Sequence, residues 1–213
     1  MSKVLVISVH PDDETLGCGG TILRHINKND EVHCLFVTSG NGEQKQLIKN
    51  VAALYGFSSY TCLGLNEITL IEMPVCELIS AISSVISQIE PETIYMPNRS
   101  DIHSDHRAVY NAVAVCTKSF RYPYIKKLLM CEVISETDFS PALLENAFVP
   151  NFFVDISGVF SKKTEILQLY ESELLPYPKT RNIDTMKALN RYRGSLINCE
   201  YAEAFMILKM IDG

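Results

Sequence analysis

The sequence predicts an α/β fold in which a mostly parallel β-sheet is covered by helices on both faces. Short apolar runs rich in Val and Ile alternate with longer segments of helical periodicity, which is the pattern of successive strand, helix, strand units. The first run, Lys3 to Val9, is apolar almost throughout, as expected of a strand covered on both sides. It ends abruptly in polar residues, at the end of a strand where parallel sheets bind ligands.

The predicted elements follow one another with short connections. Residues 17–20 (Gly-Cys-Gly-Gly) are predicted as a turn, followed by a helix around 22–26 and a strand over 32–38. The next elements are a helix over 44–55, a strand over 60–63, a helix over 74–89, a strand over 93–97, a polar loop over 98–105, a helix over 108–117 and a strand over 127–133. The last third contains a strand over 151–156, a helix over 161–173, a Pro-containing loop over 174–183, a helix over 186–194 and a strand over 204–210. We expect one domain over residues 1–213 because no repeat or linker interrupts this pattern.

Composition excludes several classes of function. The net charge is −6 and no run of Lys or Arg exceeds two residues, so nucleic acid is not an expected partner. No apolar stretch approaches the roughly 20 residues of a membrane span. The N-terminus leads into a strand without the pattern of a signal peptide, so we expect a cytoplasmic protein. The seven cysteines include no C-x-x-C pair, which argues against a thiolate zinc site and favours small buried hydrophobes.

Two clusters carry the chemistry. The segment 10–14 (His-Pro-Asp-Asp-Glu) follows the first strand, and 101–107 (Asp-Ile-His-Ser-Asp-His-Arg) follows the strand ending near Pro97. Both should emerge at the same edge of a parallel sheet, and in a common doubly wound order the first and fourth strands flank the ligand crevice. We therefore expect the two clusters to meet.

Two imidazoles and one carboxylate form a ligand set suited to catalytic zinc, because three protein ligands leave the fourth position for water. Zinc lowers the pKa of that water to about 7 and polarises a scissile carbonyl. Amide hydrolysis also needs a base and an acid. Asp12 is the natural base, His103 the natural acid or oxyanion stabiliser, and Asp105 is placed to orient an imidazole.

These motifs resemble those of the PIG-L (LmbE-like) family of zinc-dependent N-deacetylases, namely H-P-D-D-E and D-x-H-x-D-H-R. Further family-like segments are 16–21, 38–40, 63–64, 153–156 and 201–205. The resemblance implies a Rossmann-like sheet, zinc held by His10, Asp13 and His106, Asp12 as base, and His103 as acid or oxyanion stabiliser. It also implies N-acetylated amino sugars as substrates, especially N-acetylglucosamine linked to inositol, malate or another glycan.

The resemblance leaves several properties open. Residues 42–46 lack the arginine that many members carry near this point for substrate contacts, so the identity of the sugar is not defined. Fe²⁺ is an alternative metal, because availability as well as affinity decides which ion occupies such a site. A homo-oligomer is compatible with the sequence.

Each candidate residue also has a purely structural interpretation. Asp12 and Asp13, or Asp105, could cap the helix that follows, and Glu14 could face the helix N-terminus. His103 could act only as a neighbour of the ligands, and Asp101 could form a local ion pair with Arg107. His25 and His33 show no partner set and are expected to be structural or exposed. Tyr177, Lys179 and Arg181 lie in a loop that either covers the crevice or is simply exposed.

Two other functions compete with a sugar deacetylase. A nucleotide-binding regulatory module would use the Gly-rich segment 17–20 with the acidic cluster holding Mg²⁺, although the third glycine of G-x-G-x-x-G is absent. A metal hydrolase acting on a non-sugar amide would use the same ligands. In either hydrolase, the Gly40-Asn41-Gly42 segment is a loop that could line the substrate pocket.

Overall fold

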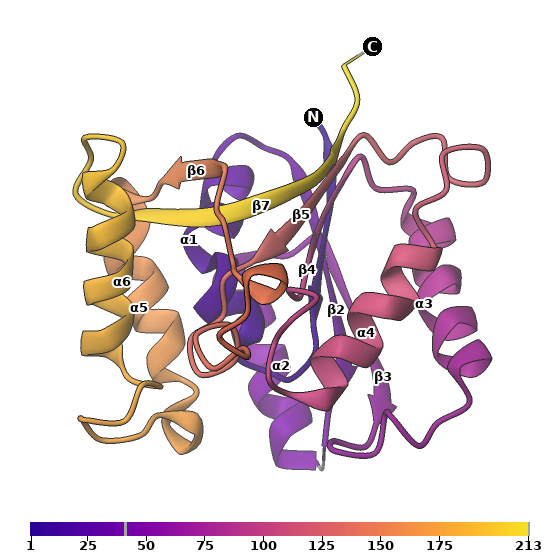
Figure 1. Cartoon of the computed structure of the whole chain (residues 1–213), viewed down its shortest axis with the longest axis horizontal. Coiled ribbons are helices and arrows are strands. Elements are labelled where there is room, and N and C mark those ends of the chain that lie inside the picture. The colour runs from indigo at the N-terminus through magenta and orange to yellow at the C-terminus, as the bar shows by residue number, and fades with distance from the viewer. Residues whose placement is uncertain (41, 213) are drawn as a thin grey trace.

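The computed structural model describes residues 1–40 and 42–212 and contains a seven-stranded sheet with helices on both faces (Figure 1). The strands are β1 (Lys3–Ser8), β2 (Glu31–Thr38), β3 (Ser59–Leu65), β4 (Thr93–Met96), β5 (Lys127–Cys131), β6 (Phe152–Asp155) and β7 (Ala202–Met210). The helices are α1 (Asp13–Asn27), α2 (Gly42–Tyr55), α3 (Val75–Ile89), α4 (Ser104–Val115), α5 (Phe160–Gln168) and α6 (Ile183–Ser195). Short 3₁₀ helices are η1 (Leu144–Asn146), η2 (Ser157–Val159) and η3 (Glu171–Glu173). The predicted α/β fold is confirmed.

The strand order determines where the functional loops lie. The order is β3-β2-β1-β4-β5-β7-β6, with β1 to β5 parallel and β7 antiparallel to both of its neighbours. The predicted adjacency of the first and fourth strands is confirmed, because Val4 to Val6 pair with Thr93 to Tyr95. The carboxyl ends of β1 and β4 therefore lie side by side, and the loops that leave them meet.

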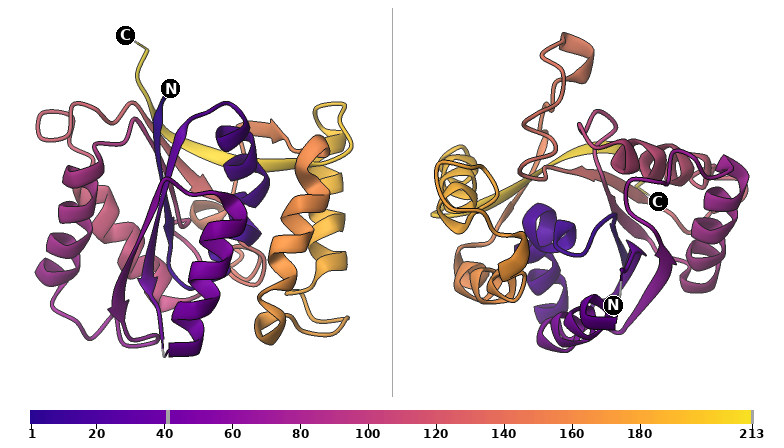
Figure 2. Two further views of the ribbon diagram at one scale, coloured as in Figure 1. Left: turned by 180° about the vertical axis from the view of Figure 1, so that it is seen from behind. Right: turned by 90° about the horizontal axis from the view of Figure 1, so that it is seen from below.

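The two faces of the sheet bury separate apolar cores. Along β1, Val4 and Val6 belong to the core under α1, α2 and α5, whereas Leu5 and Ile7 belong to the core under α3 and α4. Figure 2 shows these helical layers on opposite sides of the strands. Each fully buried side chain of this kind stabilises the fold by about 1.5–3 kcal/mol. Burial on both faces explains why β1 is apolar throughout.

The helices are amphipathic. In α3 the buried residues Leu78, Ile82, Val85 and Ile86 follow helical spacing, so one stripe faces the sheet and the other is solvated. Over the part of the chain that the structure describes, no helix combines the length and the apolar character needed to cross a membrane.

The cysteines pack as small apolar residues. Cys18, Cys34, Cys116 and Cys131 are buried, and Cys76 is exposed. Burial raises the pKa of the Cys34 thiol well above its ordinary value, which disfavours the thiolate that zinc binds. Among the described residues, no group of side chains able to hold a metal includes a cysteine.

The predicted turn over residues 17–20 is wrong, because the segment lies inside α1. The helix is kinked at Cys18, where φ is −149° and ψ is 21°, and the backbone N–H groups of Gly20 and Thr21 donate to the Glu203 carboxylate at 2.8 and 2.7 Å. Glu203 thus satisfies donors that the kink leaves without helical partners, as an N-terminal cap does. This contact comes from β7, so local sequence patterns could not reveal it.

Close packing explains why glycine occupies position 20. A Cβ atom there would lie 2.7 Å from the Cβ of Ile156, closer than real side chains approach one another. We expect Gly20→Ala to lower the free energy of unfolding by about 1–3 kcal/mol, because the second half of α1 must shift away from Ile156. Urea unfolding measures the change.

Gly158→Ala is the matched control, since a Cβ at Gly158 would meet nothing within 4 Å. Equal stability of the two variants would show that the contact between α1 and Ile156 does not require glycine.

Candidate metal centre

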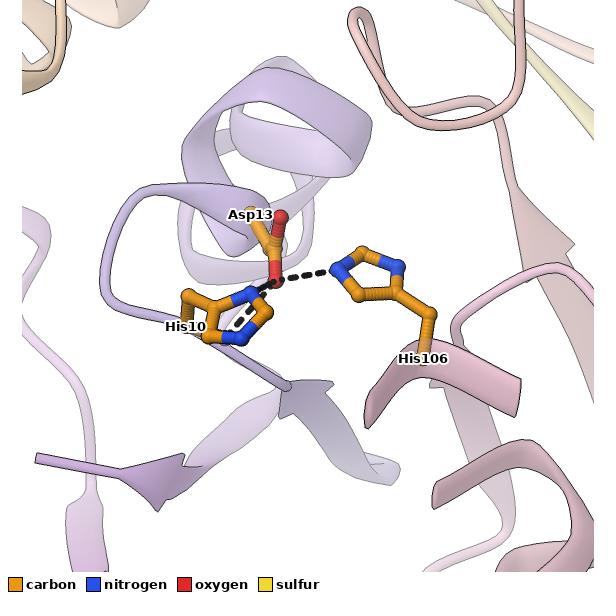
Figure 3. A group of neighbouring side chains, drawn as sticks. All are labelled: His10, Asp13 and His106. Atoms are coloured by element: carbon orange, nitrogen blue, oxygen red, sulfur yellow. Dashed lines mark hydrogen bonds and ion pairs between the residues drawn. The ribbon is translucent and has the colours of Figure 1, made fainter. Parts of the chain in front are cut away.

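Two loops converge at the carboxyl edge of the sheet. His10 and Asp12 lie between β1 and α1, Asp13 begins α1, and His106 lies in the first turn of α4, which follows the loop after β4. Figure 3 shows the His10 and His106 rings on either side of the Asp13 carboxylate. The two sequence clusters therefore meet as the parallel pairing of β1 and β4 predicts.

Asp13 Oδ2 is the centre of this arrangement. It lies 3.1 Å from His106 Nε2 and 3.6 Å from His10 Nδ1, and it accepts a 2.8 Å hydrogen bond from the backbone N–H of His10. Burial opposes ionisation of Asp13, but His106 and His10 outweigh it and hold the pKa of the carboxyl well below its ordinary value. A carboxylate therefore faces two imidazoles.

Each imidazole is held by a second carboxylate on its other nitrogen. His106 Nδ1 lies 2.8 Å from Asp101 Oδ2, and His10 Nε2 lies 3.3 Å from Asp105 Oδ2. With these nitrogens protonated, the lone pairs of His106 Nε2 and His10 Nδ1 are directed toward Asp13. Carboxylates orient metal-binding histidines in this way.

The donor set fits a divalent cation. One ligand atom from each of His10, Asp13 and His106 lies within 4.8 Å of the others. His106 is 0% exposed, and its Nε2 has no hydrogen-bond partner among the described residues. A buried lone pair 3.1 Å from a carboxylate oxygen is unfavourable unless a proton or a cation lies between them. Two nitrogens and one oxygen are the ligands of many catalytic zinc sites.

Asp101 is not the ion-pair partner of Arg107 that the sequence suggested. Its carboxylate accepts hydrogen bonds from His106 Nδ1, from the Thr137 hydroxyl at 2.8 Å and from the Asn98 backbone N–H at 3.2 Å. Arg107 instead donates to the Asp101 backbone carbonyl at 2.7 Å. Asp101 is thus a site residue that sequence reasoning missed, although its spacing of five residues from His106 was visible.

Asp105 is not the cap of α4, because the N-cap residue is His103, whose Nδ1 accepts a 3.1 Å hydrogen bond from the Asp105 backbone N–H. The Asp105 carboxylate, 0% exposed, contacts His10 and accepts the Ile68 backbone N–H at 2.7 Å. It lies where the orienting role predicted for it requires.

His103 lies beside the centre and is partly accessible. Its ring centroid is 4.6 Å from that of His10, and its side chain is 30% exposed. Because Nδ1 accepts a hydrogen bond, the proton of the neutral ring is on Nε2. Burial and the neighbouring His10 lower the pKa of His103, so the ring is neutral near pH 7.

Asp12 adopts a backbone conformation that L-residues rarely occupy, with φ of 137°. Its side chain makes no capping hydrogen bond to α1, which excludes the interpretation of Asp12 as a helix-capping side chain. It is 2% exposed, and burial together with Asp13 raises the pKa of its carboxyl well above the ordinary value. A buried carboxyl beside the ligands has the environment of a proton acceptor.

Glu14 holds the loop in this conformation. Its carboxylate is 1% exposed and accepts hydrogen bonds from the Asp12 backbone N–H at 3.2 Å, the Ser8 hydroxyl at 2.9 Å and the Tyr170 hydroxyl at 2.8 Å. The expected position at the helix N-terminus is therefore correct. Tyr170 was not predicted, and its contact fastens the loop to the segment after α5.

Arg181 reaches the centre from the loop before α6. Its Nη1 lies 3.4 Å from Asp12 Oδ2, and its Nη2 donates to Glu136 Oε1 at 3.0 Å. Arg181 is therefore a neighbour of the predicted base, whereas Tyr177 in the same loop is 78% exposed. A single arginine in a Pro-containing loop carries no local signal of this contact. Asn41, in the predicted loop Gly40-Asn41-Gly42, lies outside the described residues.

Two groups of described side chains could hold a metal ion: His10, Asp13 and His106, and His10, His103 and Asp105. His25 and His33 belong to neither group. His25 contacts Asp30 and Tyr95, and His33 contacts Ser59, so both have structural partners as expected.

Replacing the Asp101 carboxylate should weaken metal binding. Asp101→Asn retains the size of the side chain but loses the charge that fixes the His106 ring, so we expect zinc affinity to fall about 10- to 100-fold. Competition with a fluorescent chelator measures it. Asp184→Asn, an exposed position in α6, is the control, and equal affinities in the two variants would contradict the orienting role.

Metal affinity should also depend on pH. Burial alone would lower the pKa of His106, but Asp13 and Asp101 outweigh it and raise the pKa well above 6.5; the pKa of His10 is also raised. Both rings must lose a proton to bind a metal, so affinity should still increase above pH 6.5, by up to about tenfold per unit for each proton displaced. Calorimetric titration with Zn²⁺ between about pH 6 and pH 8 tests this, and a constant affinity would contradict the assignment.

Comparisons with known proteins show which family the chain resembles. Residues 5–117 match the family model PIG-L, described as GlcNAc-PI de-N-acetylase. The chain is 27% identical over 173 residues to the uncharacterised deacetylase YaiS of Escherichia coli, a match that covers 76% of this chain and 90% of that protein. It is 25% identical over 224 residues to the diacetylchitobiose deacetylase of Thermococcus kodakarensis, covering 95% and 82% respectively.

A solved structure shares the fold over the whole chain. The conserved protein TT1542 of Thermus thermophilus superposes with a TM-score of 0.80 at 22% identity, covering 100% of this chain and 97% of that one. The family model matches more than half of the chain. The chain therefore belongs to the PIG-L family, as its two motifs predicted.

Proposed function

We propose that this protein is a zinc-dependent N-deacetylase that hydrolyses the acetamide of an N-acetylated amino sugar or sugar conjugate, giving acetate and a free amine. His10, Asp13 and His106 are the ligands, and Fe²⁺ is the alternative metal in cells. The observation that carries the proposal is the buried Nε2 of His106, which makes no hydrogen bond among the described residues and lies 3.1 Å from Asp13 Oδ2.

The chemistry requires a polarised carbonyl and an activated water. A bound zinc ion supplies both, because it acts as a Lewis acid and lowers the pKa of water. Asp12, next to the ligand Asp13, accepts the proton of the attacking water. Its burial supports this role, because a carboxyl with a raised pKa is a better proton acceptor than an ordinary one.

His103 and Asp105 complete the reaction. The neutral His103 ring carries its proton on Nε2, from which it can donate a hydrogen bond to the oxyanion that forms from the carbonyl oxygen. To act as the acid toward the departing nitrogen, the ring must first take up a second proton. Asp105 accepts a hydrogen bond from His10 Nε2 and so positions this ligand. These residues provide a base on one side of the centre and a hydrogen-bond donor beside it.

The substrate class rests on the relatives. The family description names a de-N-acetylase of GlcNAc-PI, and the Thermococcus relative is named for diacetylchitobiose, so both act on N-acetylated glucosamine units. A non-sugar amide would need the same ligands, and a screen of N-acetylated sugars against simple acetamides distinguishes the two substrates.

The nucleotide-binding alternative lacks its phosphate loop. Residues 17–20 lie inside α1 around its kink at Cys18, and a Cβ added at Gly19 would lie 2.6 Å from the Tyr55 hydroxyl, so this segment packs against α2. Phosphate loops instead expose backbone N–H groups to the ligand.

Removing the base should separate binding from catalysis. Asp12→Asn keeps the side-chain shape, and Asn tolerates the positive φ at this position. We expect it to retain about one zinc per chain while kcat falls about 10²- to 10⁴-fold. Elemental analysis and amine release from N-acetylglucosamine conjugates measure the two quantities.

Asp184→Asn, exposed on α6, controls for the substitution itself. Full turnover by metal-loaded Asp12→Asn would rule out Asp12 as the base.

A further inference from the structure

A second cavity lies at the other end of the sheet from the metal centre. It has a volume of about 300 Å³ and is bordered by the last turns of α1, by Thr93 and Lys127 at the starts of β4 and β5, and by the end of β7. None of the metal-centre residues lines it. The start of β1 and the end of β7 lie at this end of the sheet, at the top of Figure 1. The cavity is therefore separate from the site of the proposed deacetylation.

The cavity lies between the second half of α1 and β6, over β4, β5 and β7. The helix ends at Asn27, and β6 borders the opposite side of the opening. The floor consists of apolar and aromatic side chains on one face of the sheet: Tyr95, Leu129, Phe152, Val154 and Ile207. In the sheet register Leu129 lies opposite Ile207, so these two side chains share a face. The floor is suited to a flat apolar group.

The rim is cationic although the chain carries a net charge of −6. Arg24, Lys28 and Lys127 line the opening, and neither lysine pairs with a carboxylate among the described residues. Lys28 follows the last residue of α1, Lys127 begins β5, and His25 lies with them in the lining of the cavity. The positive charges gather at one side of the apolar floor.

Asp155 offsets the charge of Arg24, and Lys209 is directed away from the cavity. The Asp155 carboxylate accepts hydrogen bonds from the Ser157 backbone N–H at 2.9 Å and from its hydroxyl at 2.7 Å. Lys209 donates to the Thr117 carbonyl at 2.7 Å, and its register partner Leu128 belongs to the core of the opposite face. Arg24 Nη1 donates to the Asp155 backbone carbonyl at 2.5 Å, so the cations available to a ligand are Lys28 and Lys127.

We propose that this cavity binds a small aromatic anion, with its ring system on the apolar floor and its carboxylate, sulfonate or phosphate group at Lys28 and Lys127. The volume is at the lower end of the range of about 300–1,000 Å³ for ligand pockets, which favours a compact ring system over a long chain. An apolar surface with a few convergent charged groups is the usual composition of such sites. A second copy of the chain is a poorer occupant, because a twofold contact would bring the same cations together.

Two dyes with the same ring system test the proposal. The probe is 8-anilinonaphthalene-1-sulfonate, and its neutral counterpart is N-phenyl-1-naphthylamine, which lacks the sulfonate. We expect the double variant Lys28→Glu/Lys127→Glu to bind the anionic dye at least about tenfold more weakly and the neutral dye almost unchanged, because only the charge contact is lost. Fluorescence titration of the folded full-length protein measures both affinities.

The control is Lys49→Glu/Lys187→Glu, which makes the same change in net charge at exposed positions of α2 and α6 outside the cavity. It should bind both dyes like the wild type. Val154→Trp, which fills the floor, should weaken both dyes. Deacetylation by the metal-loaded protein should be unchanged in the rim variant, because the cavity is separate from the metal centre.

Two results would overturn the proposal. One is equal binding of the anionic dye by the rim and control variants, which would show that the sulfonate does not contact Lys28 and Lys127. The other is a change in molar mass, measured by light scattering, that occurs in the rim variant and not in the control, which would identify this face as an interface between copies.

Discussion

The proposed chemistry depends on the contact between His106 Nε2 and Asp13 Oδ2, because it joins two segments that are far apart in the chain. It exists because β1 and β4 are neighbouring parallel strands whose carboxyl ends meet. The contact is buried, so its geometry is not averaged by solvent, and an ion held there is screened only weakly. If this pairing were lost, His106 would be separated from the segment that carries His10, Asp12 and Asp13.

Three buried carboxylates hold the residues of the metal centre in position. Asp101 and Asp105 hold the outer nitrogens of the two imidazoles, and Glu14 holds the backbone of the loop that carries Asp12. Burial raises the pKa of Asp12, Glu14 and Glu136, and the neighbouring Asp13 carboxylate raises those of Asp12 and Glu136 further. Arg181 offsets part of the charge, and a divalent cation would offset more. The excess of buried negative charge at the site therefore favours binding of a metal cation.

Local patterns in the sequence were sufficient to predict the succession of strands and helices along the chain and the positions of the two clusters after their strands. They succeeded because buried parallel strands must be apolar on both faces, and because polar residues directly after them must lie at one edge of the sheet. Helix boundaries were less accurate: α4 begins at Ser104, where His103 caps it, and the prediction began it at residue 108.

The errors share one physical cause, which is that distant segments supply the deciding contact. Glu203 in β7 satisfies the donors at the kink of α1, so the Gly-rich segment stays helical where a turn was predicted. Arg181 contacts Asp12, and Tyr170 contacts Glu14, although both come from the last third of the chain. The sequence around Arg181 and Tyr170 contains no pattern that predicts these contacts. Asp101 was visible in the motif, but only the folded chain shows that its carboxylate faces His106 and that Arg107 turns to backbone carbonyls.

The most direct test of the metal centre is X-ray absorption at the zinc edge of the purified, zinc-loaded protein. The account predicts nitrogen and oxygen ligands at about 2.0–2.2 Å, with the multiple-scattering signature of two imidazoles and no sulfur. A shell of sulfur atoms at about 2.3 Å, or no histidine signature, would contradict it, because the metal would then be held by cysteines or other groups and not by His10, Asp13 and His106.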